Sequence, residues 1–160
     1  MDCYLVQVGK GAETLHLLTP FSNEELAGNN SRSEFFIGRL VKPEEGVKPE
    51  NISFNLDFLV AMHQVVREVM AEDPEVTEKA KEQENGFVFI VDRRSPEDSE
   101  VEKEDIIGIF LCNERKTDAA RYRPNPDYKL ISKRGMGMLP MTAEVELKRR
   151  ILEVPSAGQE

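Results

Sequence analysis

Asp92 and the two arginines that follow it are the residues of this sequence best suited to chemistry. Asp92 closes the apolar run 87–91, and α/β enzymes often keep a carboxylate at a strand end. Arg93 and Arg94 could bind an anionic substrate there. His63 could act as a general base because imidazole titrates near neutrality, although an active site needs all these groups in one pocket. The ordinary alternative is that Asp92 accepts hydrogen bonds from loop amides or pairs with Arg94.

A basic segment at residues 115–134 suggests a second kind of site. Its candidate binding residues are Arg115, Arg121, Tyr122 and Arg123. Arginine interleaved with tyrosine is typical of surfaces that bind nucleic acid or acidic protein. The net charge of −9, from 30 acidic and 21 basic residues, disfavours nucleic acid as the main partner. The other interpretation is that these basic side chains neutralise the acidic part of the same molecule.

No motif predicts a metal or a cofactor. Cys3 and Cys112 match no metal-ligand spacing, and each lies in an apolar run, which predicts two reduced and buried cysteines. The acidic stretch 97–105 lacks the spacing and the turn glycine of a calcium loop. Residues 9–11, Gly-Lys-Gly, follow an apolar run but lack the rest of a phosphate-binding loop.

Several short apolar segments are typical of strands. Residues 3–8 and 14–18 flank the glycine turn and predict a hairpin. Further strands are predicted at 34–41, 87–92, 106–111 and 128–131. The runs at 87–92 and 106–111 are continuously apolar, so we expect neighbouring central strands that are buried on both faces. The charged segment 93–104 between them should be an exposed loop.

The helices are indicated by capping residues and by apolar spacing. Ser22 and Glu25 form a capping-box pattern for a short helix that residues 28–30 would stop. The main amphipathic helix is predicted at about 54–72, with Ser53 as its cap. A mostly solvated helix should follow at about 75–83, and a C-terminal helix at about 143–153 should have Thr142 as its cap.

These elements predict an α+β fold in a single domain spanning residues 1–154. The gaps between strands are often too short for crossover helices, which favours a mixed or mostly antiparallel sheet of about five or six strands. The main helix and the C-terminal helix should pack together on it. Residues 155–160 should form a disordered tail.

The functional interpretation follows from a well-patterned core that lacks a coherent catalytic set. No secretory signal and no membrane-length apolar run is present, so we expect a soluble, cytoplasmic protein without a membrane partner. The leading hypothesis is a non-catalytic acidic module that binds another protein, of the inhibitor, immunity or chaperone type. Its contact would be the acidic stretches 72–84 and 97–104 or the basic segment. An enzyme around Asp92 and Arg93, and nucleic-acid binding through 115–134, are the alternatives.

Overall fold

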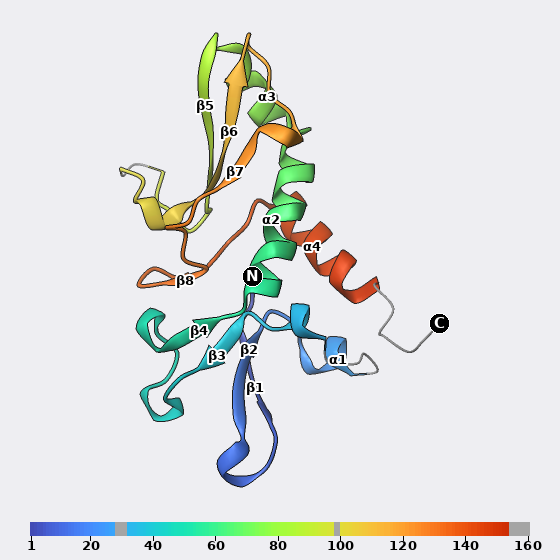
Figure 1. Ribbon diagram of the computed structural model, residues 1–160, viewed down its shortest axis with the longest axis vertical. Helices are drawn as coiled ribbons and strands as arrows, with labels where there is room; N and C mark the ends of the chain where they lie inside the picture. The colour runs from blue at the N-terminus through green and yellow to red at the C-terminus, as the bar shows by residue number, and fades with distance from the viewer. Residues whose placement is uncertain (28–31, 98–99, 154–160) are drawn as a thin grey trace. The chain divides into compact units, whose positions relative to one another are not determined.

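The computed structural model describes residues 1–27, 32–97 and 100–153 as an α+β fold (Figure 1). The α+β class and the antiparallel pairing are confirmed, because the described strands form antiparallel sheets of four, three and two strands. The expected single sheet of five or six strands is wrong. The predicted helix stop at 28–30 and the predicted tail at 155–160 lie outside the described residues.

The chain divides into two compact units. The first contains Met1–Met62 and the segment from Leu147 onward, and the second contains His63–Glu146. This division describes packing, so the single folding domain stays a prediction. None of the helices in the described ranges is long and apolar enough to cross a membrane.

The four-stranded sheet of the first unit has the strand order β1-β2-β3-β4. Its strands are β1 (Tyr4–Val8), β2 (Leu15–Thr19), β3 (Gly38–Leu40) and β4 (Ile52–Phe54). The predicted hairpin is confirmed as β1 and β2. The strand predicted at 34–41 begins only at Gly38, because a 3-10 turn occupies Ser33–Phe35. Ser53 pairs with Arg39 inside β4, so its predicted role as a helix cap is wrong.

The second unit contains the sheet β5-β6-β7 and a small hairpin of two strands. The bounds are β5 (Asn85–Val91), β6 (Ile106–Asn113), β7 (Tyr122–Pro124), β8 (Ile131–Ser132) and β9 (Gly135–Met136). The predicted pairing of the two apolar runs is confirmed as β5 with β6. Burial of both faces is wrong for β5, where Phe87 and Phe89 are 53% and 52% exposed. The strand predicted at 128–131 overlaps β8 only at Ile131.

Four helices complete the described chain. They are α1 (Asn23–Leu26), α2 (Leu56–Met70), α3 (Pro74–Lys81) and α4 (Met141–Glu153). The capping box is confirmed, because Ser22 Oγ accepts from Glu25 N at 3.2 Å and Glu25 Oε1 accepts from Ser22 N at 3.0 Å. The main helix begins two residues later than predicted. Directly before its first residue, the Asn55 side chain accepts a hydrogen bond at Oδ1 from the backbone N–H of Asp57, at 3.2 Å.

Two helix predictions need correction. Thr142 does not cap the C-terminal helix, because α4 already includes Met141. Helix α3 is less solvated than predicted, since Val76 and Ala80 are buried and the helix packs against β5. Its short apolar stripe therefore holds it beside the edge of the β5-β6-β7 sheet.

Each unit has an apolar interior of its own. In the first, the rings of Phe21 and Phe35 lie 5.0 Å apart, and Leu18 and Ile37 are also buried. In the second, the buried residues include Val66, Met70, Val88, Ile90, Ile107, Phe110 and Tyr122. Of the two cysteines, Cys112 is buried as predicted, but Cys3 is exposed.

Candidate protein-docking site

Asp92 is buried where β5 ends, and both of its carboxylate oxygens are engaged. Oδ1 accepts from the backbone amides of Arg94 and Met138, each at 2.9 Å, and Oδ2 accepts from the Tyr128 hydroxyl at 2.7 Å. The residue is 1% exposed. These are the contacts of the ordinary alternative, in which the strand-end aspartate organises a loop. A substrate has no direct access to this carboxylate.

Arg94 lies beside Asp92 and directs all its donors inward. Its side chain is 4% exposed, and its Nε lies 3.8 Å from Asp92 Oδ2. The acceptors are Asp105 Oδ1 at 2.9 Å and the backbone carbonyls of Leu130, Gly135, Glu104 and Lys129. Five acceptors match the five N–H groups of a guanidinium. Arg94 therefore joins three segments of the second unit and does not face solvent as a binding residue.

A second ion pair balances the charge of this cluster. Asp105 is 1% exposed, and its Oδ2 lies 3.5 Å from Arg134 Nε without a hydrogen bond. Two carboxylates thus face two guanidinium groups in a buried network. Burial, together with the neighbouring charge of Asp92, raises the pKa of Tyr128 well above its ordinary value. Tyr128 stays a hydroxyl donor at neutral pH, which suits a structural network.

His63 forms a separate pair with Tyr122. His63 Nδ1 lies 2.7 Å from Tyr122 Oη, and the two rings are 5.9 Å apart. Burial raises the pKa of Tyr122 and lowers the pKa of His63 to about 4. At neutral pH the imidazole is therefore uncharged, and its Nδ1 shares one hydrogen bond with the Tyr122 hydroxyl. The contacts described for His63 and for Asp92 have no residue in common, so the structure does not join them in one site.

The burial of His63 beside Tyr122 predicts that the free energy of unfolding depends on pH. The folded pKa of about 4 lies below the ordinary value of 6.5, so the unfolded chain takes up the proton first as pH falls. The stabilisation is complete above about pH 6.5 and is lost as pH falls towards about 4. Between about pH 6.5 and about pH 4, the free energy of unfolding of wild type should fall by about 2 kcal/mol more than that of His63→Gln. This value allows for the partial exposure of the His63 side chain. Urea denaturation at several pH values measures this; equal losses in both proteins would contradict it.

The basic segment is largely paired with acidic residues of its own unit. Ion pairs join Arg115 to Glu84, Arg121 to Asp118, Lys129 to Glu104, and both Lys133 and Arg134 to Glu102. The Arg134 hydrogen bond, with Lys133 nearby, lowers the pKa of Glu102.

The four candidate binding residues of this segment differ in their surroundings. Tyr122 is buried, and Arg123 is exposed and donates to the carbonyls of Ala120 and Tyr122. Arg115 donates to the carbonyl of Lys81 as well as pairing with Glu84. These contacts fit internal neutralisation better than a stacking platform for nucleic acid.

The edge of β5 is a feature that the sequence reasoning missed. Among the strands of residues 1–27, 32–97 and 100–153, β5 pairs on one side only, with β6. The Gln83 side chain covers part of the open side, because its amide accepts from Phe87 N at 3.1 Å and donates to Phe87 O at 2.9 Å. The Phe87 backbone therefore faces away from β6. In an antiparallel pair this orientation recurs two residues later, so the N–H and C=O of Phe89 also point to the open side.

A groove of about 490 Å³ runs along this open edge. Its floor is formed by residues 88–91 of β5, and its walls come from α3 and from residues 140–142. Arg93 lines it directly after the strand. Within the described ranges Arg93 has no ion pair, and its side chain is exposed. Of the candidate catalytic and binding residues, which are Asp92, His63, Arg93, Arg94, Arg115, Arg121, Tyr122 and Arg123, Arg93 is the one that lines this groove.

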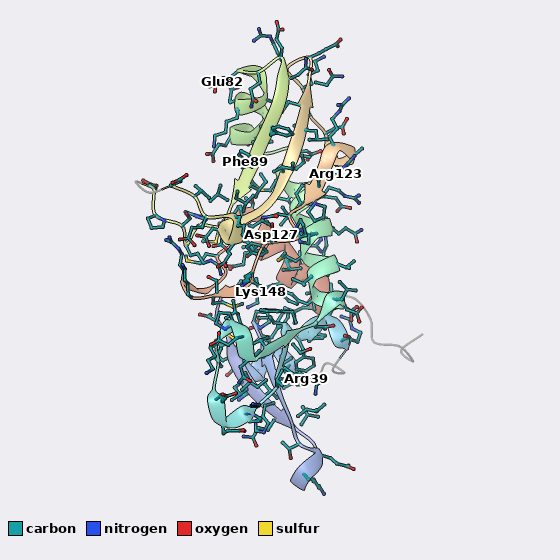
Figure 2. All side chains as sticks on the ribbon, turned by 60° about the vertical axis from the view of Figure 1, so that its left-hand side comes forward. Arg39, Glu82, Phe89, Arg123, Asp127 and Lys148 are labelled. Carbon is teal, nitrogen blue, oxygen red and sulfur yellow. The ribbon has the colours of Figure 1, made fainter. Side chains whose placement is uncertain are left out.

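The groove has an apolar floor and a charged rim. Val76, Val88 and Ile90 are buried beneath it, whereas Phe89 and Met141 are 52% and 60% exposed. Figure 2 labels Phe89. On the rim, Asp73 and Glu75 belong to the acidic stretch 72–84, and Glu97 to the stretch 97–104. The predicted acidic surface therefore overlaps the rim. Exposed and buried residues alternate along 85–91, so one face of β5 is exposed; the continuously apolar composition of this run gave no sequence signal for the edge.

Within residues 1–27, 32–97 and 100–153, no three His, Cys, Asp or Glu side chains gather in a way that could hold a metal ion. The groove beside β5 is lined by apolar and charged side chains. No family model, curated protein or solved structure matches this chain.

Proposed function

We propose that this chain is a protein-binding module that takes an extended segment of a partner protein as an added strand on β5. The observation that carries the proposal is the open backbone of Phe89 at the floor of a groove. In strand addition, main-chain hydrogen bonds supply affinity and alternate side chains supply specificity. The proposal gives the predicted non-catalytic binding role a defined surface.

The groove favours a segment of particular chemistry. Apolar side chains at alternate positions of the segment would share one face, where they can pack on the ring of Phe89, which is 52% exposed. Arg93 lies where the strand ends and can pair with a carboxylate at one end of the segment. The expected partner segment is therefore extended and alternately apolar, with one acidic residue.

The walls of the groove favour a free segment over a second copy of this chain. In a pair of identical chains, each β5 edge would have to reach the other through a groove that α3 and residues 140–142 also line. An isolated strand from a partner meets no such obstacle. Residues beside an edge strand commonly prevent pairing between copies of a protein.

A displayed library of random linear peptides tests the proposal with the full chain. We expect enrichment of alternately apolar peptides that contain an acidic residue. Phe89→Pro removes the N–H from the open side, where an edge strand tolerates proline, and should weaken binding at least about tenfold. The matched variant Phe89→Val keeps the N–H and should retain most of the affinity.

Three outcomes would overturn this assignment. They are a library that yields no binder, equal losses of affinity in Phe89→Pro and Phe89→Val, and concentration-dependent dimers of wild type that Phe89→Pro abolishes. The first two would exclude backbone recognition, and the third would identify a second copy as the occupant. Sedimentation velocity of the two variants and wild type measures the assembly state and also checks that the proline variant remains compact.

A further inference from the structure

The β1-β2-β3-β4 sheet has one face in the core and one face exposed. Leu18, Leu40 and Ile52 face inward and are buried. On the other face Leu17, Arg39 and Ser53 are aligned across three strands by the register, because Leu17 pairs with Arg39 and Arg39 with Ser53. Arg39 therefore lies between the apolar side chain of Leu17 and the hydroxyl-bearing side chain of Ser53.

Apolar side chains extend this face along the β1–β2 hairpin. Val6 pairs with Leu17, and Val8 pairs with Leu15. Val8 and Leu15 are both 44% exposed, and Tyr4, on the same face of β1, is 40% exposed. Such a stripe is one of the features that distinguish a ligand-binding surface from scattered exposed residues.

A cavity of about 540 Å³ is lined in part by residues of this face. Its lining includes Val8, Leu17, Phe36, Phe54, Arg39 and Ser53. The volume is within the range of small-molecule sites, which are mostly apolar with a few polar groups that fix orientation. Figure 2 labels Arg39 on this sheet.

The polar groups of the cavity differ in their availability. Asn55, at its rim, is occupied, because its Nδ2 donates to the carbonyls of Ser33 and Phe36 and its Oδ1 accepts from Asp57 N. Arg39, by contrast, has no ion pair within the described ranges, and neither of its cross-strand neighbours is acidic. Arg39 and the Ser53 hydroxyl remain as donors for a ligand.

We propose that this cavity binds a small monocarboxylic acid with an apolar body. The carboxylate would accept from the Arg39 guanidinium, whose planar fork suits two oxygens, and from the Ser53 hydroxyl. The apolar body would pack on Val8 and Leu17, the apolar lining residues that the register places on the same face as Arg39. One arginine balances one negative charge, whereas a phosphate dianion would meet a unit that already holds 11 acidic and 8 basic residues.

Titration of the full chain with 4-phenylbutyrate, followed by NMR of backbone amides, tests this site. We expect saturable shifts at Leu17, Arg39 and Ser53, with a dissociation constant on the order of millimolar for so small a probe. Arg39→Gln should weaken binding of 4-phenylbutyrate about tenfold or more. The uncharged probe 4-phenylbutyramide should bind wild type as weakly as 4-phenylbutyrate binds Arg39→Gln. Arg123→Gln, which removes an exposed arginine of the other unit, should leave binding unchanged.

Each contrary result has a definite meaning. No saturable shift at these residues, or equal binding of the acid and the amide, would overturn the proposal. So would an Arg39→Gln variant that binds the acid as well as wild type does. The proposal would also be overturned if 4-phenylbutyrate does not bind but a peptide with a free C-terminal carboxylate shifts the same amides. The cavity would then be a site for the C-terminus of a peptide.

Discussion

Arg94→Met is expected to lower the free energy of unfolding by about 3–5 kcal/mol, the range for removing one partner of a buried ion pair. The substitution removes the hydrogen bond to Asp105 Oδ1 and the donors to four backbone carbonyls. Asp105 would keep only Arg134, whose Nε lies 3.5 Å away without a hydrogen bond. A buried carboxylate with incomplete compensation is costly because it has lost its hydration.

Urea denaturation followed by circular dichroism measures the effect, and two variants serve as controls. Arg94→Lys keeps the charge but cannot reproduce five donors in a planar fork, so it should restore only part of the stability. Arg123→Met removes an exposed arginine that bonds to local carbonyls and should change the free energy of unfolding by less than about 0.5 kcal/mol. If Arg94→Met is as stable as Arg123→Met, Arg94 does not organise the second unit.

Gly108→Val should destabilise the protein by about 3 kcal/mol through overpacking. Gly108 is buried in β6, and the ring of Tyr122 lies directly over it. A Cβ atom at this position would stand 2.3 Å from Tyr122 Oη and 2.5 Å from Tyr122 Cε2. The ring would have to leave its place, and its hydrogen bond to His63 would be lost.

A double-mutant cycle distinguishes this clash from a general effect of changing the glycine. Tyr122→Ala removes the ring, so Gly108→Val in that background should cost little and can fill part of the cavity. The two substitutions should therefore be strongly non-additive in urea denaturation. Additive losses would mean that Tyr122 is not what restricts this position to glycine.

The sequence predicted local structure best where residue spacing and capping agree. The hairpin of β1 and β2, the helix α2 and the capping box at Ser22 follow from short-range patterns. Strand β7 could not be found in this way, because its three residues lie inside the basic segment and end at Pro124. Strands so short are stabilised by their partners in the sheet and have little intrinsic preference.

The chemistry of the charged residues could not be predicted from their order. Asp92, Arg93 and Arg94 are consecutive, yet only Arg93 lies on a groove, while the other two are buried in the ion-pair cluster. The partners that decide this difference, Tyr128 and Met138, are 36 and 46 residues from Asp92 along the chain. Contacts at such separations depend on tertiary structure, which residue spacing does not encode.

The exposed face of β5 and its open edge were both missed in the sequence. A continuous apolar run predicts a strand covered on both faces, but Phe87 and Phe89 are half exposed. Gln83 covers the backbone at Phe87 from outside the strand, and Gly86 leaves room for it, since a Cβ there would stand 2.0 Å from Gln83 Oε1. The glycine and the glutamine are consistent with an edge that is protected at one end and open at the other.

Residue-resolved amide hydrogen exchange, with and without a peptide selected on the full chain, tests the strand-addition proposal most directly. In the unbound protein, the Phe89 amide should exchange much faster than those of Val88 and Ile90, which face β6. Bound peptide should slow exchange at Phe89 by about tenfold or more, with little change at Phe87, which Gln83 already protects. Slow exchange at Phe89 in the unbound protein, or unchanged exchange in the complex, would contradict the proposal.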